Sequence, residues 1–287
     1  MENVFGYPTF DESGEKILTT YSNEYQDMRM DIRVYRMKAG EKRVFVKAGE
    51  ETAVLLLKGN VELWAEAVDT ADELVELSPD VDRAADGDGA GKRYRVQAER
   101  KDVFTAGPYC IHACGGSRIE VKALSEAEIL VQSTENNRVF EPKIYEPKDV
   151  SLVRSGEGKF GDTAKRWVST IFDAKTAPYS NMVLGEILGD RGNWSSYLPH
   201  SHPQPEVYYF LFDRPEGFGA SFVGDQVFRS TDGSFAAISG GLTHPQATAP
   251  GFVMYTCWMI RHLEGKRWLQ TDRNEDARYL WMHEAKF

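Results

Sequence analysis

Three histidines and one glutamate in the second half of the chain have a spacing that suits a metal site. His200 and His202 stand two residues apart in PHSHPQPE, which ends at Glu206. Side chains two apart on a β-strand point to the same face, so both histidines can reach one ion from a single strand. Pro203 and Pro205 exclude a helix across the gap, so we expect Glu206 to open the next strand after a tight bend.

His244 is the fourth candidate ligand. It lies in GGLTHPQ, flanked by Gly240, Gly241 and Pro245, as expected for a turn beside a strand end. Three imidazoles and one carboxylate suit zinc, manganese or iron(II), and zinc is our first expectation. A six-coordinate ion in this cage would keep two positions open for water or substrate. The alternative is that these three histidines, of six in the chain, are structural or surface residues.

The elements that must position these ligands are predicted to be almost entirely β. Short apolar runs recur at intervals of about 8–12 residues between Gly, Asp and Asn, a rhythm typical of a β-barrel or sandwich. No segment shows a sustained helical period, although residues 71–77 and 162–167 can each form about one turn of helix. The expected strands are 29–37, 52–57, 60–65, 93–98, 117–123, 128–133, 182–188, 207–212, 219–222, 226–229, 235–238 and 252–260.

A polar connector at residues 135–161 divides the chain into two halves of comparable length. We expect one barrel without metal over residues 1–148 and a second, with the metal site, over residues 149–287. The acidic stretch 69–91 is expected to be a solvated hairpin extension or loop. In the first half, Cys110, His112 and Cys114 alternate onto one strand face. Three donors this close on one strand cannot surround an ion, so a buried pair of thiols beside a histidine is the preferred interpretation.

Composition limits the classes of partner and compartment. The chain has 287 residues, three cysteines and a net charge of −10, and its mean hydropathy is −0.46. The longest apolar runs are far shorter than the roughly 20 residues of a membrane span, and the acidic balance disfavours nucleic acid. Few cysteines and no visible signal peptide indicate a cytoplasmic protein. Exposed barrel edges often pair, so a homodimer is a further expectation.

Three segments of the second half resemble one known family. GNWSSYLPHSHPQPEVYYFLF, PEGFG and GGLTHPQATAPGFVMYTCWM are similar to segments of the 5-deoxy-glucuronate isomerase family of inositol catabolism. That family is related to the uronate ketol-isomerases that act on pectin fragments. The resemblance covers most of residues 182–281, and the first half matches only loosely, mainly at 102–108. It implies an all-β bicupin fold with metal in the second barrel only, and the aldose–ketose isomerisation of a deoxy sugar acid. It also implies that His200, His202, Glu206 and His244 are the ligands.

The chain departs from this family around the cage. Pro203 stands where the family usually has an Asp, and the loop before Glu206 is shorter. Ser239 replaces a common Pro before the last ligand turn, and residues 259–268 replace a shorter segment of small residues. Because the shortened loop rims the cage, we expect it to affect substrate choice more than metal binding.

Isomerisation of a sugar acid requires a base and a cation besides the metal. One proton moves between adjacent carbons and another between oxygens, through an enediolate whose charge must be stabilised. Glu186, where the family carries a Gly-Glu pair, is the first candidate base, and a hydrogen-bond acceptor for a ligand histidine is the equal alternative. Arg166, at a family Arg position, is the first candidate for the substrate carboxylate, and Arg261 and Arg267 are the others.

Four further residues are candidates for substrate contact. Tyr208, Tyr255 and Trp258 are expected to line the barrel mouth or to pack behind it. Gln246 follows the ligand turn and is a candidate hydrogen-bond partner for a sugar hydroxyl. Two other functions share the same cage: a cupin oxygenase that uses iron(II), and a non-catalytic sugar-acid-binding cupin with a structural metal.

Overall fold

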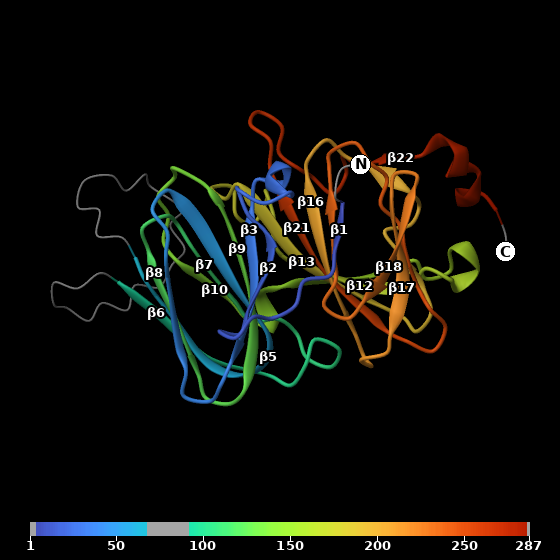
Figure 1. Cartoon of the computed structure of the whole chain (residues 1–287). Helices are drawn as coiled ribbons and strands as arrows, with labels where there is room; N and C mark the ends of the chain where they lie inside the picture. The colour runs from blue at the N-terminus through green and yellow to red at the C-terminus, as the bar shows by residue number, and fades with distance from the viewer. Residues whose placement is uncertain (1–3, 68–91, 286–287) are drawn as a thin grey trace. The chain divides into compact units, whose positions relative to one another are not determined.

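The computed structural model describes residues 4–67 and 92–285. Regular structure in these residues is almost entirely β, which confirms the predicted all-β class (Figure 1). The chain divides into two compact units: Val34–Lys148 is one, and Met1–Arg33 together with Asp149–Phe287 is the other. The expected helical turn at 71–77 and the whole acidic stretch 69–91 lie outside the described residues. The short 3-10 helices are η1 (Gln26–Met28), η2 (Pro147–Asp149), η3 (Phe160–Asp162) and η4 (Ala277–His283).

The unit Val34–Lys148 is built around one long strand, β5 (Glu50–Glu66). Its first part pairs with β7 (Cys110–Ala113) and β9 (Ala127–Glu135), and its second part with β6 (Arg93–Arg100) and β8 (Arg118–Ala123). The separate strands expected at 52–57 and 60–65 are therefore one strand. Gly59 and Asn60 resemble a hairpin turn in sequence, but β5 keeps antiparallel partners on both sides of them. The remaining strands of this unit are β4 (Lys42–Val46), β10 (Lys143–Tyr145) and most of β3 (Asp31–Met37), whereas β2 (Glu15–Thr19) belongs to the other unit.

The core of this unit is apolar. Ile111 and Ala113 of β7 belong to it, so His112 between them points to the opposite face of the strand. There the His112 Nε2 atom lies 2.9 Å from the Glu51 Oε2 atom, and both side chains are fully buried. Cys110 is buried and reduced, as are the other two cysteines. The core is filled by Tyr35, Met37, Val54, Leu56, Val61, Leu63, Ala65, Ala98, Ile111, Ala113, Ile119, Val121, Ala123, Ala127, Ile129 and Val131.

The other unit has one large antiparallel sheet. Its order is β1-β19-β16-β21-β13-β12-β11, and a four-stranded sheet has the order β14-β20-β17-β18. In Figure 1, β21 lies between β16 and β13, the two strands with which it pairs. The bounds are β1 (Phe5–Gly6), β11 (Ser151–Ser155), β12 (Arg166–Phe172), β13 (Met182–Gly189), β14 (Trp194–Ser195), β15 (His200–Ser201), β16 (Glu206–Phe212), β17 (Phe218–Val223), β18 (Gln226–Thr231), β19 (Phe235–Ile238), β20 (Gln246–Thr248), β21 (Met254–Arg261) and β22 (Asn274–Glu275).

The first residues of the chain belong to this second unit, which differs from the expected division into 1–148 and 149–287. Phe5 of β1 pairs with Ala236 of β19 and so extends the large sheet by one strand. Tyr25 packs edge-on against Phe235, with ring centroids 4.9 Å apart. Two paired residues are too short a strand to show periodicity in the sequence. No sequence pattern could therefore indicate that the first residues pair with β19.

Strand alternation decides which side chains enter the interior of this unit. Ile187 of β13, Tyr208 and Phe210 of β16, and Trp258 and Ile260 of β21 belong to one apolar cluster. Neighbouring positions on each strand point to the opposite face of the sheet. The inner face of the large sheet therefore carries both the apolar cluster and, at the start of β16, the carboxylate of Glu206.

Candidate metal centre and pocket

The four predicted ligands occupy three neighbouring pieces of backbone. His200 lies in β15 and His202 directly follows it, Glu206 opens β16 as expected, and His244 precedes β20. The turn that holds His244 packs against the loop after His202, since the Gly241 N–H donates to the His202 carbonyl at 2.8 Å.

Gly240 makes this close packing possible. A Cβ at this position would collide with the Pro203 carbonyl. The two glycines of GGLTH therefore bring the fourth ligand to the other three.

Three of the four candidate ligands form a tight cluster. Atoms of His202, Glu206 and His244 that can bind a metal all lie within 4.8 Å of one another. The Glu206 Oε2 atom is 3.1 Å from Nε2 of His202 and 3.3 Å from Nε2 of His244. Two ligands that each lie about 2.1 Å from an ion and meet at a right angle are about 3 Å apart. The observed separations therefore match adjacent ligands of one ion.

The outer nitrogen of each candidate histidine is fixed by the main chain. In His200, His202 and His244, Nδ1 faces a backbone carbonyl, which can only accept a hydrogen bond, so Nδ1 carries the proton. In the neutral ring, Nε2 is then left with its lone pair, as a metal ligand requires. The accepting carbonyls are those of Leu198, Gln204 and Leu242, at 2.8, 3.1 and 2.9 Å.

These residues fit a divalent cation. Burial lowers the pKa of His244, which keeps its imidazole neutral, and its Nε2 is buried without a hydrogen-bond partner. A buried lone pair aimed at a carboxylate oxygen is unfavourable unless a cation lies between them. A cation held by Glu206 and the histidine Nε2 atoms would satisfy all of these groups together.

His200 stands slightly apart from the tight cluster. Its ring centroid is 4.8 Å from that of His244. The ring lines a pocket together with His202 and Glu206. Burial, followed by repulsion from His244, lowers the pKa of His200 to about 3. A neutral imidazole that is not protonated even in mild acid is suited to bind a cation.

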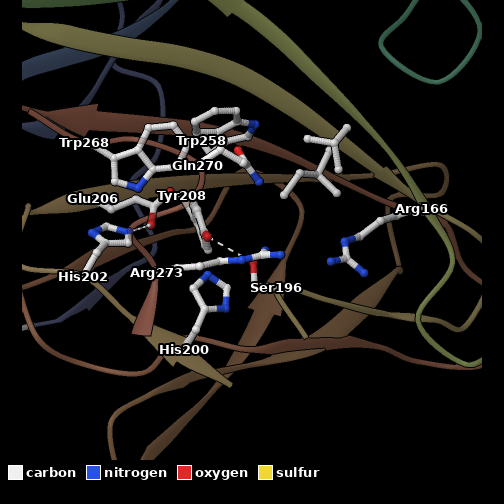
Figure 2. A pocket seen from close by; sticks show the side chains of 12 residues that line it. Arg166, Ser196, His200, His202, Glu206, Tyr208, Trp258, Trp268, Gln270 and Arg273 are labelled. Carbon is white, nitrogen blue, oxygen red and sulfur yellow. Dashed lines mark hydrogen bonds and ion pairs between the residues drawn. The ribbon is translucent and has the colours of Figure 1, made fainter. Parts of the chain in front are cut away.

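Three of the four candidate ligands, His200, His202 and Glu206, line one pocket (Figure 2), and His244 is not among its lining residues. The space is about 480 Å³, a volume that includes open solvent. The Tyr208 hydroxyl lies 3.0 Å from the Ser196 Oγ atom. Burial, followed by the charge of Glu206, raises the pKa of Tyr208 well above its usual value. The lining residues are Arg166, Val168, Ile187, Ser196, His200, His202, Glu206, Tyr208, Trp258, Trp268, Gln270 and Arg273.

Three of the other predicted site residues line this pocket: Arg166, Tyr208 and Trp258. Arg166 is buried, and its two terminal nitrogens donate to the carbonyls of Ala164 at 2.7 Å and Tyr197 at 3.3 Å. Burial, followed by repulsion from Arg273, lowers its pKa to about 10, so the guanidinium remains charged at neutral pH.

The remaining predicted contacts lie elsewhere, and the expectation for Glu186 must be corrected. Its neighbour Ile187 faces the pocket, so Glu186 points to the opposite face of β13, where it accepts a 2.6 Å hydrogen bond from the Tyr255 hydroxyl. Neither Glu186 as a base nor Tyr255 as a substrate contact is placed at this pocket. The error came from counting strand alternation without knowing which face of β13 is inside.

Gln246 and two arginines are also engaged in structural contacts instead of lining the pocket. The Gln246 amide donates to the His244 carbonyl at 2.7 Å, and its oxygen accepts from the Ser195 hydroxyl at 3.1 Å, so it supports the ligand turn. Arg261 donates to the carbonyls of Asn181 and His262. Arg267 donates to main-chain carbonyls at residues 177–180.

Sequence reasoning missed five lining residues: Val168, Ile187, Trp268, Gln270 and Arg273. The last three belong to residues 263–276, a segment whose only regular structure is a short strand, so no period could indicate which side chains face the pocket. The available signal was the unusual tail at 259–268, which already departs from the family pattern.

One antiparallel barrel has histidines and a glutamate on its inner wall, and the chain contains a second barrel with an apolar interior. Two such barrels in one chain define a bicupin. The sequence matches the KduI/IolB family over residues 7–281, and the chain belongs to that family. The structure resembles an IolB-like protein of Salmonella typhimurium, with a TM-score of 0.77 and 19% identity over 98% of this chain and 99% of that one. It also resembles Lactobacillus farciminis oxalate decarboxylase, with a TM-score of 0.65 and 12% identity over 100% and 91%. These likenesses confirm the expected cupin fold.

Curated relatives are more distant in sequence than the family match suggests. The 5-deoxy-glucuronate isomerase of Geobacillus thermodenitrificans is 26% identical over 54% of this chain and 61% of its own length. That of Geobacillus kaustophilus is 26% identical over 57% and 63%. The matched region thus spans less than two thirds of these relatives. No helix of the described residues is long and apolar enough to cross a membrane.

Proposed function

We propose that this protein is a metal-dependent aldose–ketose isomerase that acts on a deoxy sugar acid of the 5-deoxy-glucuronate type. The observation that supports it most is the convergence of His202, Glu206 and His244, the first two of which line a pocket that two guanidinium groups also line. Membership of the KduI/IolB family, and relatives named 5-deoxy-glucuronate isomerase, support the same reaction.

The metal is proposed to be held by Glu206 and by Nε2 of His200, His202 and His244, with zinc as the first candidate. A bound divalent cation supplies Lewis-acid polarisation of a carbonyl and a neighbouring hydroxyl. Arg166 offers a positive charge to the substrate carboxylate from the pocket wall. The indole of Trp258 forms part of the apolar wall against which the carbon chain can lie.

Tyr208 and Ser196 are the proposed carriers of the oxygen-bound proton. Their hydroxyl oxygens are 3.0 Å apart, and both side chains line the pocket. Because the Tyr208 phenol keeps its proton at neutral pH, it can donate a hydrogen bond to a substrate oxygen and take its own from Ser196. Glu186 has no part in this scheme, since it lies on the other face of β13.

The test is turnover of defined substrates by protein of known metal content. Purified protein is incubated without oxygen with 5-deoxy-glucuronate, glucuronate and galacturonate, and the products are followed by NMR. We expect an aldose-to-ketose conversion that is lost on chelation and restored by one divalent metal. Failure of the metal-loaded protein to convert any of these acids would refute the proposal. Turnover that occurs only in a parallel incubation in air, with consumption of oxygen, would indicate the oxygenase alternative instead.

A further inference from the structure

We propose that residues 263–276, here called the C-terminal segment, make this pocket selective for acidic polyhydroxy compounds, with Arg273 as the group that binds the carboxylate. The inference deepens the proposed function, because it specifies how the substrate class of that same site is recognised. It is carried by three observations: how the segment is attached, how charge is distributed in the pocket, and which buried donors lack acceptors.

The C-terminal segment is fastened to the backbone that carries the candidate ligands. Its strand β22 pairs with β15, so that Glu275 lies opposite His200. The Asp276 N–H donates to the Pro199 carbonyl at 2.9 Å. On the other side of the segment, the Gln204 side-chain amide donates to the Lys266 carbonyl at 2.9 Å. The backbone at Arg273 is therefore held next to the ligand strand, and its exposed side chain lines the pocket.

The shortened loop after His202 makes one of these attachments. Gln204 is the middle residue of this loop, and its side chain is buried. The backbone N–H of Trp268 is held separately, by a 3.0 Å hydrogen bond to Nδ1 of His262. The loop at residues 203–205 departs from the family pattern, and so do residues 259–268. The first of these departures thus supports the second.

The charges that face the pocket do not balance. Arg166 and Arg273 both line it, while Glu206 is the only carboxylate among the lining residues and is held against His202 and His244. Arg166 already donates to two main-chain carbonyls. Arg273 has no hydrogen bond or ion pair to the residues that the structure describes. Two guanidinium groups without a carboxylate between them favour an anionic ligand, and the unengaged fork of Arg273 suits a carboxylate.

Two buried indole groups supply a second, independent indication of a polar ligand. Trp258 and Trp268 both line the pocket, with ring centroids 5.5 Å apart (Figure 2). Their Nε1 atoms are buried and find no acceptor among the described residues. Buried N–H groups are normally satisfied, so these donors indicate a ligand that brings its own oxygen atoms. Sugar hydroxyls are such acceptors, and the carboxylate at Arg273 completes a sugar acid.

The test compares binding of an acid with binding of its neutral counterpart. Metal-loaded protein is titrated calorimetrically with D-glucuronate, its methyl ester and D-glucose, and metal content is measured for every variant. We expect wild type to bind glucuronate at least about tenfold more tightly than the ester or glucose, and Arg273→Gln to lose that preference while its glucose affinity and metal content stay unchanged. Arg273→Lys should recover part of the preference, because a charge remains without the planar fork.

Arg278 provides the matched control. It lies directly after the C-terminal segment, is exposed, and pairs with Asp276 at 2.6 Å instead of facing the pocket. Arg278→Gln should leave both affinities unchanged. Equal losses of affinity for glucuronate and glucose in Arg273→Gln would overturn the proposal in favour of a structural role for Arg273. An unchanged preference would overturn it in favour of Arg166 alone.

The two proposals fail in different ways. Selective glucuronate binding that depends on Arg273, without turnover of any uronate, would refute the isomerase function and leave the binding site intact. Turnover of a uronate with a KM that is unchanged in Arg273→Gln would refute the role of Arg273 and leave the isomerase function intact.

Discussion

The two barrels of this chain differ most in what fills them. The interior of the unit Val34–Lys148 is an unbroken cluster of aliphatic and aromatic side chains. The interior of the other unit combines a similar cluster with the candidate ligands His202, Glu206 and His244, beside a pocket lined by two arginines. Among the described residues, only this second interior contains a group that could hold a metal ion.

This difference shows that position on a strand, and not residue type, separates a site from a structural contact. The first barrel also has a buried histidine and glutamate, His112 and Glu51, but they lie on the strand face away from its core and satisfy each other. In the second barrel, Glu206 lies on the inner face, beside imidazoles whose lone pairs need a cation. Burying such groups in an interior without a partner is costly, so a set of them facing one pocket indicates function.

The largest expected effect comes from removing one ligand of the second barrel. In His244→Ala we expect the bound metal to fall from about one ion per chain to none, and activity to fall by at least about a hundredfold, because the Lewis acid is lost with it. Metal analysis and the uronate assay on the same samples measure both. Retained turnover in protein shown to be free of metal would refute a catalytic metal site in the second barrel.

The corresponding change in the first barrel should act on stability alone. His112→Ala removes the imidazole from the fully buried pair with Glu51. We expect unfolding to require about 1–3 kcal/mol less free energy, because the buried Glu51 carboxylate loses a hydrogen-bond partner. Denaturant unfolding measures this loss, and metal content per folded chain should stay at the wild-type value. A loss of metal in His112→Ala would show that the first barrel contributes to the site.

The sequence predicted the cage because its spacing is local. His200, His202 and Glu206 sit within seven residues, and alternation with two prolines leaves few geometries. It failed for Glu186, since period-two alternation gives two faces but not which of them is inside. The sequence could not predict that Arg273 lines the pocket. Its position depends on the pairing of β22 with β15, a two-residue contact between distant parts of the chain.

A smaller effect is expected from closing the space beneath Trp258. A Cβ on Gly185 would collide with the Trp258 ring and with the Ser169 carbonyl, and the backbone contact cannot move easily. We expect Gly185→Ala to cost about 1–3 kcal/mol of unfolding free energy and to raise KM more than it lowers metal content, since it displaces a pocket wall.

Unfolding, substrate kinetics and metal analysis check this expectation. The control is Gly49→Ala, at a turn of the first barrel where a Cβ meets nothing within 4 Å and φ is +73°. That change should leave KM unchanged. Equal KM changes in both variants would mean that the effect does not come from Trp258.

The smallest effect concerns pH and the residue that holds Trp268 in place. Burial, followed by repulsion from Arg267 and Arg261 and partly offset by Asp173, lowers the pKa of His262 from its usual 6.5 to about 3. Between these values the unfolded chain binds a proton that the folded chain does not, so stability falls as pH decreases from about 6.5. His262→Asn keeps an acceptor for the Trp268 N–H but cannot titrate. We expect the slope of unfolding free energy against pH, measured between pH 6.5 and 4.5, to be smaller in this variant by at most about 1.4 kcal/mol per pH unit. The other histidines are the same in both proteins, so the difference isolates His262, and identical slopes would show that burial does not lower its pKa in the folded protein.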